Sequence, residues 1–409
     1  MKHKLERRTV IKRLAGLTGV AAAPILAGAS STQPANPGDT ELNTVRTPGR
    51  PPSLIGARAP EVKIQRQVLL DIASATPLQD LHGALTPADL HFERHHAGIP
   101  AIDSEQHELL IHGMVDKAIK FSVADLKRFP SVTRICFLEC SGNLLTTVTE
   151  RSTPQLVCGL TSQSEWTGVS LRTLFTELGV KPGASWFLAE GGDAALMTRS
   201  IPLEKAMDDA FIAYAQNGEP LRPEQGFPIR LLLPGWEGNT SIKWLRRLEL
   251  SDQPFMTREE TSKYTDPLKN GTARQFSVIM DARSVITAPT FPVWLEKGWH
   301  EIRGLAWSGR GKIVRVDVST DGGRHWHEAV LQGPVLSKAH TRFSLPWQWR
   351  GGAAELMSRA VDETGYVQPS RRQILDTRGP GSVPYHLNPI LSWLVQSDGQ
   401  VLYKAEPWI

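Results

Sequence analysis

Cysteine is scarce in this sequence, which has three among 409 residues: Cys136, Cys140 and Cys158. Three cysteines cannot build the disulfide network that stabilises many small secreted proteins. None of them lies in a Cys-x-x-Cys-His motif, so we expect no c-type haem in this chain. Paired Cys-x-x-Cys motifs are also missing, which excludes the common structural zinc and iron–sulfur sites.

The sequence also lacks a long basic block and a long apolar run. Its net charge is a mild +4, and Lys and Arg do not cluster after the N-terminus, so we expect no nucleic-acid partner. The apolar segment at residues 14–26 is shorter than the roughly 20 residues that a membrane-spanning helix needs. We therefore expect no membrane span.

The N-terminus has the pattern of an export signal. Arg7 and Arg8 precede the apolar segment, and Ala-Gly-Ala at residues 27–29 fits a cleavage site. The arginine pair resembles a twin-arginine signal, which exports folded proteins that often already carry a cofactor. We therefore predict a signal peptide at residues 1–30 and a periplasmic mature protein.

The rest of the chain divides by its pattern. Residues 31–60, rich in Pro, Gly, Ser and Thr, are predicted to be a linker or extended tail. Residues 61–271 mix helices and strands, including a helix capped by Ser170 and ended by Gly179, and strands at 229–233 and 242–250. Residues 272–380 contain short alternating strands and a hairpin signal at 319–323, which are typical of an immunoglobulin-like β-sandwich. Residues 381–409 are expected to be a C-terminal tail. The predicted fold is thus a mixed α+β domain followed by a β-sandwich.

Cys140 ends a strand-like segment and directly precedes a Gly-Asn turn. An alternation with a period of two places Arg134, Cys136, Leu138 and Cys140 on one face of this strand. A free cysteine is most often a small buried hydrophobic residue. A thiolate at a strand end can also serve as a soft metal ligand. The residues alone leave both interpretations open.

Several motifs follow one another in a fixed order. They are Cys-Ser-Gly-Asn at 140–143, Glu-Pro-Leu-Arg-Pro-Glu-Gln-Gly-Phe-Pro-Ile-Arg at 219–230, Ile-Lys-Trp-Leu at 242–245, Trp-Ser-Gly at 307–309, and Val-Asp-Val-Ser-Thr-Asp-Gly-Gly-Arg-His-Trp at 316–326. This order resembles the sulfite oxidase family of molybdenum enzymes. Residues 253–266 and 385–393 are most similar to the bacterial SoxC-type sulfite (sulfane) dehydrogenases of that family.

The resemblance implies a molybdenum–molybdopterin cofactor (Mo-co) held by the α+β domain through one thiolate. Cys140 occupies the position of that metal ligand, whereas Cys136 and Cys158 are expected to be packing residues. The resemblance further implies catalytic roles for three residues. Arg94 and Arg378 would bind the sulfur oxyanion, which suits a guanidinium, and Tyr264 would contact the substrate or a metal-bound oxygen.

The resemblance also implies a set of cofactor-binding residues, which are His96, Asp193, Gln225, Arg230 and Lys243. His95 is expected to be a bystander, and a turn role is an equal alternative for Asp193. Arg230 and Lys243 lie on predicted strands, where a buried cation is costly unless it is paired, and a pterin phosphate would supply the partner. The alternative for these two is the polar face of a half-buried strand.

The sequence departs from the animal and plant members of the family at the expected substrate pocket. Gln225 replaces a histidine, Leu144 and Leu145 replace paired arginines, and residues 160–162 replace a tryptophan of the anion pocket. The pocket therefore loses positive charge and gains apolar surface. This leaves open whether the substrate is free sulfite or sulfur attached to a carrier protein.

The resemblance implies a sulfite dehydrogenase that oxidises sulfur and passes electrons to a separate, SoxD-like c-type cytochrome. It also implies a homodimer formed through the second domain, and a sulfur-carrier protein remains a further candidate partner. The alternatives are a related molybdopterin reductase, acting on nitrate or methionine sulfoxide, and a non-catalytic structural homologue.

Overall fold

The computed structural model describes residues 48–49, 51–144, 148–379 and 385–406, and the chain separates into two units at Val62 and Lys63. The described residues of the first unit form neither helix nor strand. The predicted signal peptide and most of the predicted linker lie outside the described residues. No helix in the described ranges is long and apolar enough to cross a membrane.

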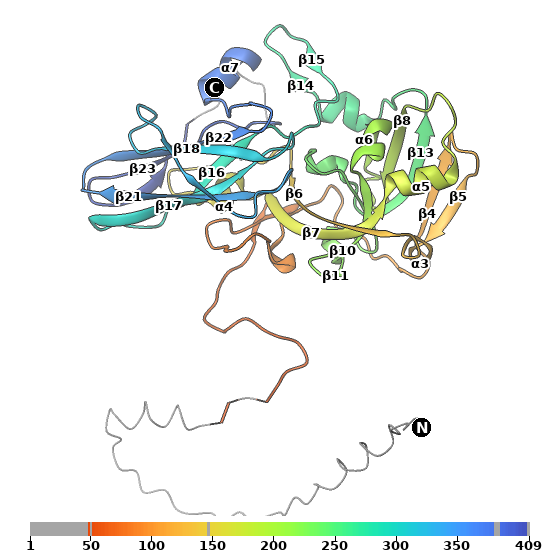
Figure 1. The fold of residues 1–409 in the computed structure, drawn as a ribbon, viewed down its shortest axis with the longest axis horizontal. Helices are drawn as coiled ribbons and strands as arrows, with labels where there is room; N and C mark the ends of the chain where they lie inside the picture. The colour runs from red at the N-terminus through yellow and green to blue at the C-terminus, as the bar shows by residue number, and fades with distance from the viewer. Residues whose placement is uncertain (1–47, 50, 145–147, 380–384, 407–409) are drawn as a thin grey trace, which may run out of the picture. The chain divides into compact units, whose positions relative to one another are not determined.

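The second unit begins with the α+β domain, shown in orange to green in Figure 1. Its strands are β1 (Gln67–Leu69), β2 (Ala73–Ala75), β3 (Glu93–Arg94), β4 (Glu108–Gly113), β5 (Ile119–Ser122), β6 (Ser131–Glu139), β7 (Thr161–Ser170), β8 (Trp186–Gly191), β9 (Thr198–Pro202), β10 (Phe211–Gln216), β11 (Glu219–Pro220), β12 (Arg230–Leu232) and β13 (Leu245–Ser251). One main sheet has the order β5-β4-β13-β8-β9, and the other has the order β11-β10-β7-β6 with β12 beside β10. The strands β1, β2 and β3 form a small third sheet.

Short helices connect these strands. They are η1 (Ala88–Leu90), α3 (Val123–Leu126), α4 (Pro154–Cys158), α5 (Leu171–Leu178), α6 (Leu203–Asp208), η2 (Pro223–Gln225), η3 (Gly238–Thr240) and η4 (Glu259–Lys263), and the hairpin of β14 (Asp266–Pro267) and β15 (Ala273–Arg274) follows them. The helix α5 has the predicted ends, because it starts after Ser170 and ends before Gly179, which has a φ of 69°, but the Ser170 side chain makes no capping hydrogen bond. Its buried side chains, Leu174 and Phe175 among them, pack into the core of this domain.

The strand β7 was not predicted, although it pairs with β6 over nine residues. Its first half is polar but buried, at Ser162, Gln163 and Ser164. The Ser162 hydroxyl accepts a hydrogen bond from Phe92 N, and Gln163 donates to Ala84 O. Hydrogen bonds of this kind allow polar side chains to occupy a core position, so hydrophobic alternation could not reveal this strand.

The second domain is a β-sandwich, shown in cyan to blue in Figure 1. Its elements are β16 (Arg283–Ala288), β17 (Gly298–Trp307), β18 (Ile313–Ser319), β19 (His327–Glu328), β20 (Val330–Gln332), β21 (Thr341–Trp349), β22 (Ala354–Asp362), α7 (Arg371–Arg378), β23 (Ser392–Val395) and β24 (Val401–Tyr403). The two sheets have the orders β16-β17-β21-β20 and β19-β18-β22-β23-β24. The hairpin expected at 319–323 connects β18 to β19.

The predicted C-terminal tail at 381–409 contains two strands of this sandwich. The strand β23 pairs with β22 and β24 pairs with β23, so both extend the second sheet. Trp393 of β23 is fully buried in the sandwich core. The segment therefore belongs to the second domain, and its short strands were hidden by the Pro- and Gly-containing sequence around them.

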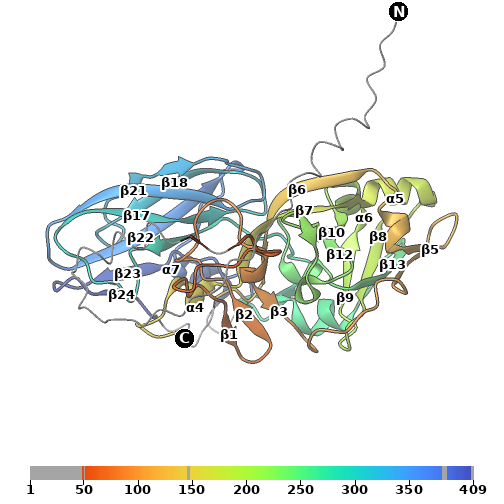
Figure 2. The ribbon, with the colours of Figure 1, turned by 90° about the horizontal axis from the view of Figure 1, so that it is seen from below.

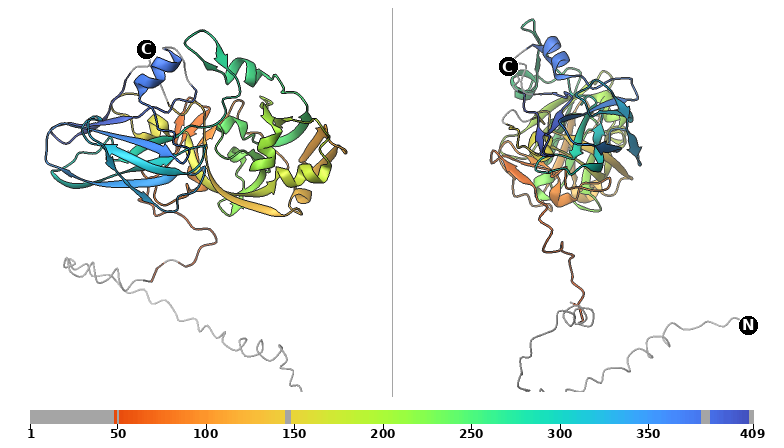
Figure 3. Two further views of the ribbon diagram at one scale, coloured as in Figure 1. Left: turned by 45° about the horizontal axis from the view of Figure 1, so that its top comes forward. Right: turned by 90° about the vertical axis from the view of Figure 1, so that its left-hand side faces the viewer.

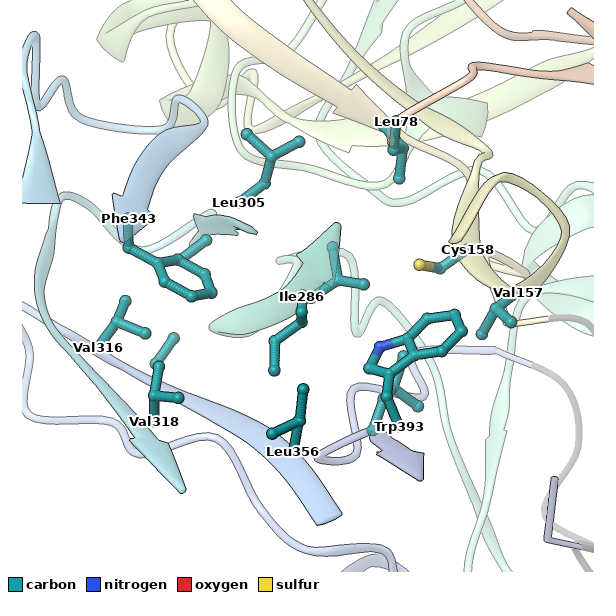
Figure 4. Packing of buried hydrophobic residues seen from close by; sticks show 14 of the residues in the cluster. Leu78, Val157, Cys158, Ile286, Leu305, Val316, Val318, Phe343, Leu356 and Trp393 are labelled. Carbon is teal, nitrogen blue, oxygen red and sulfur yellow. The ribbon is translucent and has the colours of Figure 1, made fainter. Parts of the chain in front are cut away.

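The apolar core of the sandwich continues into the α+β domain. Val157 and Cys158 of α4 lie beside Trp393, and Leu78 belongs to the same buried cluster (Figure 4). Phe137 of β6 also joins this cluster. Figure 2 shows α4 and the β1–β3 sheet next to each other at the boundary between the two domains. In both views of Figure 3, α7 lies beside the β14–β15 hairpin. The two domains thus share a packed boundary, and β6 lies along it.

Candidate functional site

A cavity of about 330 Å³ opens in the α+β domain and brings together eight of the nine predicted site residues. These residues are Arg94, His96, Cys140, Asp193, Gln225, Arg230, Lys243 and Tyr264. They come from distant parts of the chain, and the folding of the two main sheets and the small sheet places them around one space. Arg378 does not line this cavity.

Cys140 follows the last residue of β6 and faces the cavity. The predicted alternation is confirmed, since Cys136, Leu138 and Cys140 belong to one apolar cluster while Phe137 joins the cluster of the sandwich. Among these cysteines only Cys140 lines the cavity, and the remaining one, Cys158, is fully buried. Burial raises the pKa of the Cys140 thiol, whereas the backbone of the following turn and the charge of Arg94 oppose this increase. A bound metal ion would favour the thiolate.

The turn after Cys140 is held at both ends. Cys140 N donates to Leu160 O at 2.9 Å, and Leu160 N donates to Asn143 Oδ1 at 2.7 Å. Gly238 packs against the backbone of this turn, because a Cβ atom at this position would lie 2.8 Å from Glu139 O. The Cys-Ser-Gly-Asn motif therefore forms a rigid turn, in which Asn143 fixes the position of the cysteine.

Arg230 is a buried cation and Lys243 is a half-buried one, and their hydrogen-bond acceptors among the described residues are all uncharged groups. Arg230 donates to the carbonyls of Gln225 and Ser241, and its Nε atom has no partner among the described residues. Lys243 Nζ donates to the carbonyls of Arg94 and Glu224. Burial lowers the pKa of Arg230 to about 9 and lowers the pKa of Lys243 well below its usual value.

Two cations that have no carboxylate partner among the described residues fit an anionic ligand, because a negative group in the cavity would offset the cost of taking their charges out of water. Gly226 brings them close together with a φ of 105°, since a Cβ atom there would lie 3.0 Å from the Lys243 Cβ atom and 3.2 Å from the Arg230 Cβ atom. The structure also refines the predicted strand at 242–250. Because β13 begins at Leu245, Lys243 lies in the loop before it.

His95 is not the bystander that the sequence suggested. Its Nδ1 atom lies 2.9 Å from Lys243 Nζ, and its Nε2 atom lies 2.7 Å from Glu93 Oε2. If Nε2 carries the proton and donates to the carboxylate, Nδ1 is free to accept from the lysine. The Glu93–His95 pair thus orients Lys243. A His between Arg94 and His96 gave no signal of this role, because Glu93 and Lys243 meet it only in the folded chain.

Gln225 and Asp193 line the cavity and also support its wall. Gln225 Nε2 donates to Phe92 O at 2.9 Å, so the amide links the loop before β12 to the segment before β3. Asp193 Oδ1 accepts from Met197 N at 3.3 Å, which makes it the closing residue of a turn between β8 and β9. Asp193 therefore both closes a turn and lines the cavity, so the two alternatives given for it above are compatible.

Tyr264 and His96 face each other across the cavity mouth, and His96 Nε2 lies 3.1 Å from the Tyr264 hydroxyl. Partial burial and the charge of Arg94 lower the pKa of His96, so the neutral ring is favoured. Burial raises the pKa of Tyr264, which keeps the phenol protonated and able to donate a hydrogen bond. The guanidinium of Arg199 lies 5.0 Å from the centre of the Tyr264 ring.

Arg378, predicted to contact the substrate, is placed elsewhere. It forms an ion pair with Asp266 at 2.9 Å, and it donates to the carbonyls of Tyr385 and His386 at 3.0 and 3.2 Å. Its side chain lines a separate cavity between α7 and the sandwich. The guanidinium is therefore occupied in holding the backbone at Tyr385 and His386.

Tyr385 is a cavity residue that the sequence analysis did not assign to the site. Its ring centre lies 5.1 Å from that of Tyr264, so two phenols border the same space. The apolar wall was partly foreseen: Leu144 and Leu160 line the cavity, whereas Leu145 lies outside the described residues. Leu69 and Ile72 of the β1–β2 hairpin extend this wall.

Comparisons with known proteins agree with this geometry. Residues 96–259 match the family model of the oxidoreductase molybdopterin-binding domain, and residues 274–392 match that of the Mo-co oxidoreductase dimerisation domain. Sulfite oxidase from Gallus gallus is 32% identical, over 74% of this chain and 72% of that protein. An NADH nitrate reductase from Ulva prolifera is 31% identical over 70% of this chain, which spans only 38% of that protein's length.

A solved structure gives a closer likeness. The crystal structure of the sulfane dehydrogenase SoxCD from Paracoccus pantotrophus contains a chain with a TM-score of 0.81 and 41% identity, which covers 88% of this chain and 98% of that one. The predicted architecture, a molybdopterin-binding domain followed by a dimerisation domain, is thereby confirmed. These matches, together with the cavity around Cys140, show that the chain belongs to the sulfite oxidase family of molybdenum oxidoreductases, as a member of its SoxC type.

Proposed function

We propose that this chain binds Mo-co through Cys140 and oxidises sulfur, either as free sulfite or as sulfane sulfur on a carrier protein. One observation carries the proposal: the thiol of Cys140 shares a cavity with Arg94, with an apolar wall, and with Arg230 and Lys243, two cations that have no carboxylate partner among the described residues. The thiolate suits the metal, and the two cations suit the phosphate of a pterin.

Mo-co, when bound, supplies oxygen transfer to sulfur and the uptake of an electron pair. The protein supplies orientation and charge. Arg94 would hold the negative charge of the substrate or of the oxygens that its sulfur acquires, because a guanidinium can donate two parallel hydrogen bonds. Tyr264 would donate a hydrogen bond from its protonated hydroxyl, which His96 orients from 3.1 Å. Lys243 would be kept in place for the cofactor by His95 and Glu93.

The apolar wall favours a substrate that carries less charge than free sulfite. Leu144 and Leu160 line the cavity where charged and aromatic residues were expected from animal and plant relatives. Free sulfite needs several donors to replace its hydration, whereas a sulfur group at the end of a carrier's side chain needs fewer. Carrier-bound sulfane sulfur is therefore the substrate class that we favour.

The remaining parts of the proposal concern partners and location. Oxidation releases an electron pair, and we propose a separate c-type cytochrome as its acceptor. A homodimer through the sandwich is supported by the match to a dimerisation domain. Export to the periplasm is proposed from Arg7 and Arg8 and the segment after them.

The assay that tests this proposal uses the purified full-length protein with cytochrome c as acceptor. Sulfite, thiosulfate and a carrier protein loaded with thiosulfate are compared, and nitrate is tested with a reduced dye as donor. We expect cytochrome reduction to be faster with the loaded carrier than with free sulfite. Nitrate reduction without any sulfur oxidation would contradict the proposal and favour the nitrate reductase branch.

A matched pair of variants tests the anion site. Arg94→Gln should lower kcat/KM roughly 10- to 100-fold, because a hydrogen-bonded charge contact to the substrate is lost. Arg134→Gln is the control, since Arg134 is exposed on β6 and does not line the cavity. If the two substitutions lower kcat/KM equally, Arg94 does not bind the substrate.

A further inference from the structure

The residue before Cys140 is a buried carboxylate that connects the two domains. Glu139 Oε1 accepts hydrogen bonds from Asn143 Nδ2 at 2.9 Å and from an Arg283 terminal nitrogen at 2.8 Å. Glu139 Oε2 accepts from Trp307 Nε1 at 2.6 Å. Arg283 and Trp307 belong to the sandwich, where they face each other as partners on β16 and β17. Two neighbouring strands of the second domain thus hold one carboxylate of the first.

These contacts continue to Cys140 without a break. Asn143 is bonded to Glu139 through its amide nitrogen and to Leu160 N through its amide oxygen. Leu160 O in turn accepts from Cys140 N. Arg283 closes the arrangement from the other side by donating to the carbonyl of Asn143 at 2.5 Å. The position of the cysteine turn therefore depends on a guanidinium from the sandwich.

This arrangement is a costly way to join two domains. Glu139 and Arg283 are 1% and 2% exposed, and a buried ion pair contributes little net stability because both charges lose their hydration. Two guanidinium nitrogens of Arg283 also lack a partner among the described residues. The apolar cluster that includes Leu78, Phe137 and Trp393 already joins the domains. The buried pair is therefore best explained by the fixed position that it gives to the turn after Cys140.

We propose that Glu139, Arg283 and Trp307 are positioning residues for the metal-binding thiolate of Cys140. The sandwich would then be part of the metal site as well as a dimerisation domain. The proposal rests on the proposed role of Cys140 as the metal ligand. Groups that hydrogen-bond to a metal ligand without contacting the metal commonly determine how tightly a site retains its metal.

The test compares Glu139→Gln, Arg283→Met and the double variant in the full-length molybdenum-loaded protein. Asp209→Asn is the matched control, because Asp209 is also a buried carboxylate that pairs with a sandwich residue, Lys338, at 2.6 Å, yet its ion pairs with Lys338 and Lys205 do not involve the turn at residues 140–143. For each protein we would measure the rate of molybdenum loss on dialysis, the EPR spectrum of the partly reduced metal, and Tm.

We expect both single variants to lose molybdenum roughly 10- to 100-fold faster than the unaltered protein and to show a shifted EPR spectrum. The double variant should regain Tm, because no buried charge is left unpaired, but it should still lose molybdenum quickly, because Asn143 O lacks its donor. Asp209→Asn should lower Tm and leave the EPR spectrum unchanged.

Two results would overturn the proposal. One is an unchanged EPR spectrum and metal retention in both single variants. The other is metal retention that simply follows Tm across all the variants, the control included, since a purely structural role predicts that pattern. Molybdenum in the unaltered protein distinguishes these failures from failure of the proposed function, in which no preparation would contain the metal.

Discussion

At the scale of single residues, three chemically identical cysteines have different surroundings. Cys136 is buried in the strand, and burial raises its pKa to about 12. Cys158 is packed in α4 within the shared core, where burial raises its pKa to about 11. Cys140 alone lies at a strand end in the cavity. The alternation on β6 predicted the shared face of Cys136 and Cys140, but it did not show that Cys140, at the end of the strand, faces the cavity where we propose that it binds the metal.

Cysteine-to-serine variants make this difference measurable. Cys140→Ser should abolish turnover and bound molybdenum, because a serine hydroxyl is a hard ligand that stays protonated at neutral pH. Cys136→Ser should keep both and lose only some stability, because it buries a hydroxyl in an apolar cluster. Metal analysis and steady-state kinetics provide the readout, and equal losses in both variants would show that the ligand was wrongly chosen.

His386 predicts a pH dependence of stability. Its Nε2 atom lies 3.0 Å from Glu237 Oε2, and Asp266 and Arg378 also face it. Burial opposes the charged ring, but the carboxylate of Glu237 outweighs this and raises the pKa of His386 above its ordinary value. The stabilisation is therefore fully present below a pH of about 6.5 and is lost as the pH rises through the folded-state pKa.

Urea denaturation at several pH values tests this sign. The free energy of unfolding should fall as the pH rises above about 6.5 in the unaltered protein, and His386→Gln should flatten that fall. If the variant keeps the same slope, the titrating group is another residue and the Glu237 pairing contributes little.

At the scale of elements, sequence patterns predicted the helices and strands whose stability depends on residues close to them in the sequence. The helix α5 was predictable from Ser170 and Gly179 because caps and periodicity are local. The strand β7 was not, because its buried Ser and Gln side chains are satisfied by distant segments. The strands β23 and β24 were assigned to a tail because each is short and is stable only when it pairs with the strands of a larger sheet.

The strand β23 gives a direct test of that correction. Trp393→Ala should lower the free energy of unfolding by about 3–5 kcal/mol, as expected for a large side chain removed from a core. Trp299→Ala, the same substitution at a residue that is 69% exposed, should have an effect within about 0.5 kcal/mol of zero. Chemical denaturation compares the two variants. A negligible effect of Trp393→Ala would show that residues 392–403 are not part of the sandwich core.

At the scale of the whole molecule, the site depends on how the domains pack. The family resemblance supplied eight of the cavity residues, and five of them lie in short sequence motifs, namely Cys140, Gln225, Arg230, Lys243 and Tyr264. It could not supply Tyr385, the support of Lys243 by His95, or the link from Glu139 to Arg283. Each of these joins segments more than a hundred residues apart or on separate domains, and only the packed chain brings them together.

We propose above that Cys140, Arg230 and Lys243 hold a molybdenum cofactor. Metal analysis of the purified full-length protein, expressed in a host that makes molybdopterin, tests this most directly. We expect near-stoichiometric molybdenum in the unaltered protein and none in a Cys140→Ser variant whose circular dichroism shows that it is folded. Folded protein without molybdenum, or equal molybdenum in both proteins, would contradict it.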